Sequence, residues 1–287
     1  MKIICRWLNC RVFYVFLWLC LLAGCTSLDP SHETLIFSAT GDGPLSNLDW
    51  TLLPKYFDLE KADGRSEFLL HVGDITSQCL TLPESYYIKV AKLYQSCPIP
   101  VIFVPGDNEW NDLENPDEGW LYWERHFLSF EKNFKSHPQI RHQPVRQENI
   151  AWISKGVLLI GINLVGGMVH DEAEWKLRHQ QNADWIRENF EGYGRQVRAV
   201  VVFAQARPSI LLHEDFFSPF VESARLFRKP VLYLHGDGHY WDYEPAWRAE
   251  NILRVMVDQV TKAPPVLITV TLDLEQPFIF DRRLEQK

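Results

Sequence analysis

Several common signatures of enzymes and of membrane-spanning proteins are missing from this sequence. There is no Gly-x-Ser-x-Gly elbow and no phosphate-cradling P-loop, so neither a serine hydrolase nor a P-loop NTPase is indicated. The apolar run from Val12 to Gly24 has thirteen residues, short of the roughly 20 that a membrane-spanning helix needs. We also find no internal repeat, low-complexity tract or internal linker, which favours one domain over two.

Positive charge is scarce as well. The 287 residues include 29 Lys and Arg against 37 Asp and Glu, which gives a net charge of −8. Nucleic-acid-binding proteins neutralise phosphates with clustered Lys and Arg. We therefore expect no nucleic-acid partner. The sequence indicates no particular oligomeric state, while its 46% of apolar residues are enough for a large core.

The N-terminal segment has the pattern of a signal peptide. Lys2, Arg6 and Arg11 precede the apolar run, which ends in the tetrapeptide Leu-Ala-Gly-Cys25. This tetrapeptide resembles the bacterial lipobox, which implies cleavage before Cys25 and attachment of a diacylglycerol to its sulfur. Removing the segment before Cys25 takes away three positive charges and no negative ones, so the net charge becomes −11.

The same resemblance implies a location. Thr26 follows Cys25, in place of the Asp that typically retains such lipoproteins in the inner membrane. We therefore expect a protein of the bacterial cell envelope, lipid-anchored in the outer membrane and facing the periplasm. The expected division of the chain is a lipoprotein signal peptide (1–24), a polar tether (25–33) and one folded domain (34–287).

Cysteine is rare beyond the lipobox. Only Cys79 and Cys97 follow Cys25. In an oxidising periplasm they could form a disulfide, and they could equally remain two buried thiols.

Hydrophobic patterning predicts alternating strands and helices. Continuous apolar runs expected to form buried strands lie at 34–40, 68–72, 101–105, 157–165, 197–204 and 231–235. Longer helical patterns lie between them, such as those at 85–95, 121–134 and, most clearly, 171–190. This alternation indicates α/β layering. The segments 252–260 and 265–280 follow one another without a helix, which predicts an antiparallel section that closes a second sheet.

Gly-Asp pairs recur at the ends of the apolar runs. Four such pairs occur, with their carboxylates at Asp42, Asp74, Asp107 and Asp237, whereas composition predicts about one. Loops beyond the carboxyl ends of strands bind ligands in open α/β sheets. Four acidic loops at one edge would repel one another, and a divalent cation is the simplest means of neutralising them.

The last of these loops has further candidate ligands. The stretch LYLHGDGHYW contains His235, Asp237 and His239, separated by glycines that leave these side chains accessible. An apolar strand that ends in two imidazoles and a carboxylate is typical of a ligand cluster. His71, inside the apolar stretch FLLHV, is expected instead to be a hydrogen-bonded core histidine.

The order of these motifs resembles a known family. TGDGP, HVGDI, PGDNEW, VVFAQARP and HGDGHYW together resemble the calcineurin-like metallophosphoesterases, and more narrowly a divergent bacterial branch with Gly-Asp-Asn-Glu-Trp and His-Gly-Asp-x-His-Tyr motifs. The resemblance runs from about Phe37 to Trp241. It implies a four-layer αββα sandwich of two mixed β-sheets flanked by helices. It also implies one or two divalent metal ions and a metal-bound hydroxide that hydrolyses a small-molecule phosphomonoester or phosphodiester.

The resemblance assigns metal ligands position by position. Asp42 would bind the first metal ion, Asp74 would bridge both ions, and His239 would complete the first site. Pro44 stands where the family has a His ligand, so that ligand is missing.

The second site departs further from the family. Asp107 replaces an Asn, Gln205 replaces a lone His, and Asp237 replaces the first His of the last motif. Together with Asp74, these residues would offer only oxygen ligands. Such a set favours Mg²⁺, Mn²⁺ or Ca²⁺ over Zn²⁺.

The supply of a proton to the leaving group is the weakest part of the resemblance. Asn108 occupies the place of the family's proton-donating His, and an amide cannot deliver a proton at neutral pH. His235 is the nearest alternative acid in the sequence, although it could equally be a hydrogen-bonded histidine at a strand end. Asn108 and Glu109 could instead fix their loop by hydrogen bonds to backbone.

A second function therefore stays open. The chain could be a catalytically silent lipoprotein of the same fold with a binding or envelope-scaffold role. Pro44 and Asn108 are the residues that favour this alternative. The neighbouring aromatic residues Trp110, Trp120 and Trp123 are expected to serve packing more than substrate binding.

Overall fold

The computed structural model describes residues 33–286. The signal peptide, the lipidation of Cys25 and the tether up to residue 32 therefore lie outside the described residues. Within 33–286, no helix combines the length and the apolar character needed to cross a membrane. Cys79 and Cys97 are both free thiols, and Cys97 is buried.

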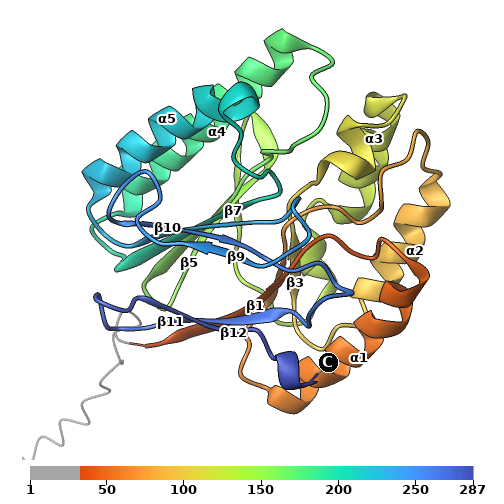
Figure 1. Ribbon diagram of the computed structural model, residues 1–287, viewed down its shortest axis with the longest axis horizontal. Coiled ribbons are helices and arrows are strands. Elements are labelled where there is room, and N and C mark those ends of the chain that lie inside the picture. The colour runs from red at the N-terminus through yellow and green to blue at the C-terminus, as the bar shows by residue number, and fades with distance from the viewer. Residues whose placement is uncertain (1–32, 287) are drawn as a thin grey trace, which may run out of the picture.

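Two mixed β-sheets form the middle of the molecule (Figure 1). The first has the order β12 (Phe278–Asp281), β11 (Val266–Val270), β1 (Leu35–Thr40), β2 (Leu69–His71) and β3 (Val101–Phe103). The second has the order β4 (Arg141–Gln143), β5 (Arg146–Ser154), β6 (Val157–Gly161), β7 (Ala199–Ala204), β8 (Val231–His235), β10 (Ile252–Met256) and β9 (Asp242–Glu244). Strands β1, β2 and β3 are parallel to one another, as are β6, β7, β8 and β10.

Helices cover the outer face of each sheet (Figure 1). The first sheet carries α1 (Asn47–Asp63), α2 (Glu84–Tyr94) and α3 (Pro116–Phe127), and the second carries α4 (Glu172–Tyr193) and α5 (Ile210–Phe227). Short helical turns occur at Asp107–Asn111, Phe130–Asn133 and Leu284–Gln286.

Three apolar layers hold these elements together. Phe37, Trp152 and Phe203 belong to the layer between the two sheets. A second layer packs α4 and α5 against the seven-stranded sheet, and a third packs α1 to α3 against the five-stranded sheet. Helix, sheet, sheet and helix are thus stacked in four layers, so the predicted αββα class is confirmed.

Two of the helices contain a proline. Pro54 lies inside α1 and Pro219 inside α5. Ser46 nevertheless begins α1 with a capping box, since its side chain accepts from the backbone N–H of Asp49 and the Asp49 side chain accepts in return. Tertiary packing therefore overrides the local cost of proline.

The C-terminal prediction was wrong in one respect. β10 does not pair with β11; it lies parallel to β8, with Ile252 beside Val231. β11 instead joins the other sheet, antiparallel to β1, with Leu35 beside Val270. Consecutive strands can thus belong to different sheets, and a pattern of apolar runs does not reveal their partners.

A buried histidine in α5 makes stability depend on pH. His213 is 1% exposed, its Nε2 donates to the Val165 carbonyl at 3.0 Å, and burial lowers its pKa to about 4. As the pH drops, this imidazole becomes protonated in the unfolded chain before it does so in the folded protein. The free energy of unfolding therefore falls between pH 6.5 and about pH 4. His213→Gln retains a donor without the titrating ring. Between pH 7 and pH 4, the free energy of unfolding measured in urea should fall by about 1–3 kcal/mol less in this variant than in the wild type.

The exposed His170 provides a control, because His170→Gln should follow the wild-type profile. If His213→Gln and the wild type lost the same free energy of unfolding on acidification, His213 would not be the cause of the pH dependence.

Candidate metal centre

The four Gly-Asp loops lie at the carboxyl ends of their strands. β1, β2 and β3 are parallel neighbours, so their loops meet at one edge of the first sheet. The backbone N–H of Asp42 donates to the Gly73 carbonyl at 3.0 Å, and that of Gly43 donates to the Asp74 carbonyl at 2.8 Å. The loop after β8 arrives from the other sheet, where the Gly236 N–H donates to the Gln205 carbonyl at 3.2 Å.

Close approach explains the glycines that precede two of these aspartates. A Cβ at Gly106 would lie 2.1 Å from both the backbone nitrogen and Oδ1 of Asp74. A Cβ at Gly236 would lie 2.9 Å from Oδ2 of Asp42. Only glycine lets these loops come together, so part of the Gly-Asp repetition reflects packing around the carboxylates.

Backbone strain concentrates in the same loops. Asp42, Asp74, Asp237 and His239 have φ values of 51°, 62°, 72° and 66°, in the left-handed region that residues other than glycine seldom adopt. Residues in this region persist only where the surrounding structure holds them, and they cluster at functional sites.

Asp42, Asp74 and His239 form a group suited to a metal ion. One ligand atom from each residue lies within 4.8 Å of the others. His239 Nε2 lies 3.3 Å from Oδ1 of Asp42, which also accepts from the Asp237 N–H at 3.2 Å. The other oxygen of Asp42, Oδ2, is buried and has no hydrogen-bond partner. A buried carboxylate oxygen without a donor fits a cation ligand.

Asp107 and Asp237 extend this group toward the second sheet. A Cβ placed on Gly166 would be 3.1 Å from Oδ2 of Asp107 and 3.5 Å from Oδ1 of Asp237. Asp237 Oδ2 accepts from the Arg207 N–H at 3.3 Å. All four predicted carboxylates therefore converge on one region.

Gln205 holds two of these carboxylates in a way the sequence did not predict. Its Oε1 accepts from the Gly166 N–H at 2.7 Å, which fixes the orientation of the amide. Its Nε2 consequently faces the acids and donates to Asp74 Oδ2 at 3.2 Å and to Asp107 Oδ1 at 3.1 Å. In this geometry Gln205 positions the carboxylates, because its oxygen accepts from Gly166 and its nitrogen donates to the acids. Its expected role as an oxygen ligand of the metal ion stays a prediction.

Burial raises the pKa of the clustered carboxylates. Burial, followed by repulsion from Asp107, Glu109 and Asp42, raises the pKa of Asp74 well above its usual value. Burial likewise raises the pKa of Asp107 to about 7, and it raises the pKa of Asp42 despite the opposing effect of His239. Gathering buried like charges costs free energy that a bound divalent cation would offset.

Glu109 fixes the loop, as one of the sequence alternatives proposed. It is fully buried, with Oε1 accepting from the Gly106 N–H at 2.6 Å and Oε2 accepting from the Ile75 N–H at 3.4 Å. The backbone N–H of Asn108 adds a bond of 3.3 Å to Asp74 Oδ1. These bonds join the loops after β2 and β3.

His235 does not fit the role of acid that was considered for it. It is fully buried, its Nδ1 donates to the Gly236 carbonyl at 2.9 Å, and its Nε2 accepts from the Arg254 guanidinium at 3.1 Å. Burial lowers its pKa to about 3. A neutral imidazole that accepts from a guanidinium has no proton to give at Nε2, so the strand-end interpretation agrees with the geometry.

The remaining sequence candidates serve packing. His71 is fully buried, donates from Nε2 to the Gly43 carbonyl at 2.9 Å and stacks on Phe103, as expected for a core histidine. Trp120 stacks on Trp123, with ring centroids 5.2 Å apart, and contacts Trp110 edge-on.

Sequence reasoning missed Arg178, which supports the loop after β3 from α4. Its side chain is 2% exposed and lies between the rings of Trp110 and Trp175, at 4.9 and 4.8 Å from their centroids. Its Nη2 donates to Asn111 Oδ1 at 3.4 Å. The sequence could have indicated this role, because Arg178 lies three residues after Trp175 and therefore on the same, apolar face of the helix predicted at 171–190.

No protein-family model matches the sequence, and no curated protein matches it. Similar solved structures exist. GAP50, the anchor in the inner membrane complex of Plasmodium, has a TM-score of 0.56 at 10% identity, over 86% of this chain and 83% of that chain. A 5'-nucleotidase from Candida albicans has a TM-score of 0.49 at 13% identity, over 86% of this chain and 51% of that chain. At these identities the likeness concerns the fold alone.

Proposed function

We propose that this chain is a metal-dependent phosphoesterase that hydrolyses a small-molecule phosphomonoester or phosphodiester with one or two divalent ions. The observation that carries the proposal is the convergence of four aspartates, three of them fully buried or nearly so, around the unpartnered Oδ2 of Asp42. The ordered motifs that resemble calcineurin-like metallophosphoesterases support it.

Each residue has a defined part in this proposal. Asp42 and His239 would hold a first ion, Asp107 with Asp237 would hold a second, and Asp74 would be a ligand shared by both. Bound divalent ions supply Lewis acidity and lower the pKa of a water ligand. Gln205 and Glu109 keep the carboxylates in place through the hydrogen bonds described above.

The ligand set favours hard cations. With Gln205 engaged by Gly166, the second position has carboxylates from Asp74, Asp107 and Asp237 and no nitrogen ligand. Carboxylate oxygens suit Mg²⁺, Mn²⁺ or Ca²⁺. His239 is the one imidazole of the group.

The site has a weak supply of protons for the leaving group. Asn108 has no proton to give at neutral pH, and His235 is engaged by Arg254. General acid catalysis typically contributes 10²–10⁴-fold. We therefore expect the protein to prefer substrates whose leaving group departs without protonation.

A leaving-group series tests this proposal. Purified protein with Mn²⁺ or Mg²⁺ should hydrolyse 4-nitrophenyl phosphate at least about 10²-fold faster than phenyl phosphate, and EDTA should stop both reactions. Activity that persists in EDTA at the same rate would contradict the metal-dependent mechanism.

The alternative is a catalytically silent binding or envelope-scaffold protein that has kept the fold and lost the catalytic acid and metal ligands. Its supporting observation is the engagement of His235 by Arg254, which leaves Asn108 without an acid to replace it. Elemental analysis of protein purified without chelators separates the two: stoichiometric metal supports the enzyme, and no metal under metal-replete conditions favours the scaffold.

We further propose that the protein belongs to the bacterial envelope, anchored through a diacylglycerol on Cys25 in the outer membrane and facing the periplasm. The lipobox-like tetrapeptide before Cys25 supports this location. A Cys25→Ser variant that no longer incorporates labelled palmitate, while the wild type does, would agree with it.

A further inference from the structure

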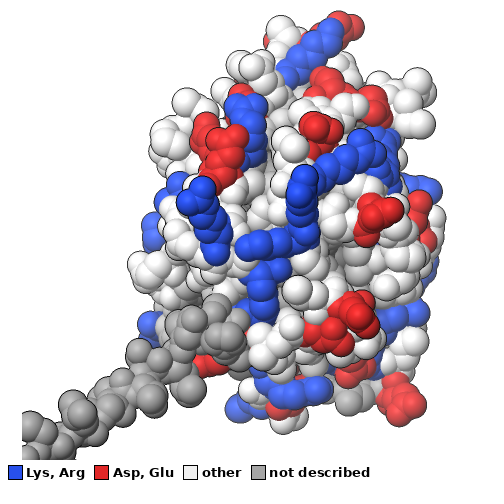
Figure 2. Space-filling model, turned by 90° about the vertical axis from the view of Figure 1, so that its left-hand side faces the viewer, with Lys and Arg blue, Asp and Glu red and all other residues white. Residues whose placement is uncertain are grey.

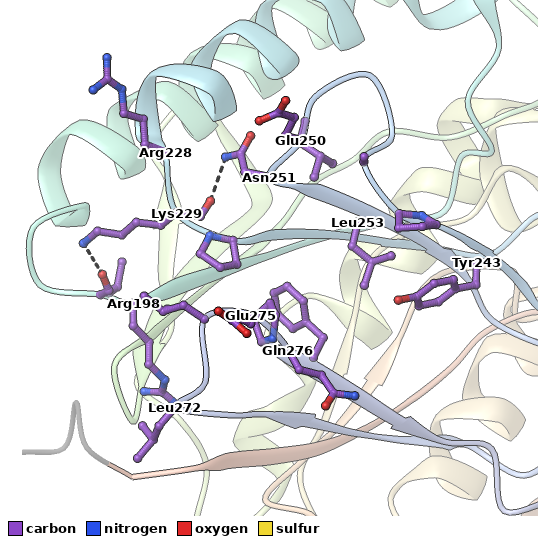
Figure 3. Close-up of a pocket in the computed structure, with 18 of the residues that line it drawn as sticks. Arg198, Arg228, Lys229, Tyr243, Glu250, Asn251, Leu253, Leu272, Glu275 and Gln276 are labelled. Atoms are coloured by element: carbon purple, nitrogen blue, oxygen red, sulfur yellow. Dashed lines mark hydrogen bonds between the residues drawn. The ribbon is translucent and has the colours of Figure 1, made fainter.

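A groove lies at the end of the strands opposite to the metal centre. It has a volume of about 880 Å³ and is lined by residues that precede β7 and β8, by the start of β10 and by the turn between β11 and β12. Figure 3 shows Leu253 and Tyr243 at one end of the groove, with Arg198 and Lys229 at the other. The groove lies at the amino ends of these strands, whereas the metal centre lies beyond the carboxyl ends of β7 and β8. The groove is therefore remote from the metal centre.

Cations dominate this face although the protein is acidic. The groove and a smaller one of about 620 Å³ beside it share Arg228 and Glu250. Their basic residues are Arg195, Arg198, Arg225, Arg228, Lys229 and Arg248, and their acidic residues are Glu250 and Glu275. Figure 2 shows Lys and Arg side chains gathered near the middle of this side of the molecule. Six cations and two anions line the two grooves, and Glu214 pairs with one of the cations, Arg248, at 2.9 Å. The lining therefore carries an excess of positive charge in a chain of net charge −8.

Exposed leucines lie beside the cations. Leu272 and Leu274, in the turn between β11 and β12, are 48% and 65% exposed and line the groove. Asp273 and Glu275 alternate with them, which favours contact at the level of lipid headgroups over deep insertion. Protein surfaces that bind anionic membranes typically combine exposed apolar side chains with neighbouring cations.

The chain before residue 33 joins the body at this same face. Arg198 donates from Nη2 to the Glu33 carbonyl at 2.8 Å and from Nε to the Thr271 carbonyl at 3.0 Å. One guanidinium thus ties the start of the described chain to the base of the leucine turn. β1 then runs six residues, about 20 Å, to the loop of Asp42 (Figure 1).

We propose that this face docks on an anionic lipid bilayer, with Leu272 and Leu274 at the headgroup level and the cations, led by Arg195 and Arg228, against lipid phosphates. The proposal rests on the anchoring proposed above, because an anchor eight residues before Glu33 would hold this face near the membrane. The metal centre then opens away from the bilayer. A soluble phosphoester, and not a lipid of the same membrane, is the substrate that this orientation admits.

Hydrogen exchange on the full chain in vesicles tests the docking. The protein is reconstituted in vesicles of phosphatidylcholine alone or of phosphatidylcholine with phosphatidylglycerol. With the anionic lipid, exchange should slow in peptides that cover 243–251 and 271–277, and it should not slow at 236–241. Arg195→Glu with Arg228→Glu should remove the slowing, since this pair lowers the occupancy of the docked state at least about tenfold.

Matched variants separate docking from general effects. Lys176→Glu with Arg187→Glu reverses two exposed cations of α4, and Leu211→Ser replaces a leucine that is 94% exposed at the start of α5. Both should exchange as the wild type does, whereas Leu272→Ser with Leu274→Ser should reduce the slowing.

Three results would overturn the docking. Hydrogen exchange could fail to slow with anionic lipid, or it could slow at 236–241 instead. Exchange could also slow without lipid as the protein concentration rises, which would indicate contact with a second copy. Flotation with vesicles in high salt reports the anchor separately. A failure of the anchor, of the docking or of phosphoester hydrolysis can therefore be told apart.

Discussion

Asp74→Asn is expected to stabilise the metal-free protein and to abolish its stabilisation by divalent metal. In EDTA, the substitution removes a buried carboxylate that three neighbouring acids repel, so the free energy of unfolding should rise by about 1–3 kcal/mol. With Mn²⁺, the wild type should gain stability in proportion to metal occupancy, and the variant should gain little. Turnover of an aryl phosphate should fall at least about 10²-fold. Thermal unfolding in EDTA and in Mn²⁺ measures both effects on stability.

Asp184→Asn is the matched control. Asp184 lies on α4 and pairs with Arg187 at 2.7 Å, remote in the sequence from every Gly-Asp loop. Its variant should keep the metal-induced shift in melting temperature. If Asp74→Asn destabilises the metal-free protein and leaves the metal-induced shift intact, the four aspartates do not form a cation site.

The second large effect concerns a buried ion pair that fastens the C-terminal segment. Arg283 and Glu60 have side chains that are 0% exposed, and Arg283 Nη1 donates to Glu60 Oε1 at 2.6 Å. Arg283 also donates to Ser38 Oγ at 3.2 Å. Arg283→Met leaves the Glu60 carboxylate buried without its cation, so the free energy of unfolding should fall by about 3–5 kcal/mol in a urea titration.

The double variant Glu60→Leu with Arg283→Met shows whether the unpaired charge is the cause. Replacing a whole buried pair by apolar residues of similar size is often neutral. The double variant should therefore recover most of the stability lost in the single variant. A double variant as unstable as Arg283→Met would assign the loss to packing instead.

Much of the metal centre could be predicted because the strands at its base are continuous apolar runs. Parallel strands place their carboxyl ends at one edge, so the Gly-Asp pairs after β1, β2 and β3 had to meet. The pair after β8 came from the other sheet, and its place depended on the resemblance to a known family. The alternation of strand and helix patterns indicated α/β layering, whereas the four-layer order came from the resemblance.

Other features depend on contacts that no local pattern records. Gln205 turns its amide nitrogen to the acids because a backbone N–H, that of Gly166, claims its oxygen. His235 cannot act as an acid at Nε2 because that nitrogen accepts from Arg254, on the neighbouring strand β10. Helices α1 and α5 keep Pro54 and Pro219 inside them because tertiary packing stabilises both helices.

Metal binding to the metal-free protein is the most direct test of the central claim, that distant acidic loops form one cation site. Titration calorimetry with Mn²⁺ should show one or two ions bound per chain in the wild type and in Asp184→Asn, and a weakened or absent site in Asp74→Asn. A wild type that binds no ion saturably, or an Asp74→Asn variant that binds as the wild type does, would contradict the account.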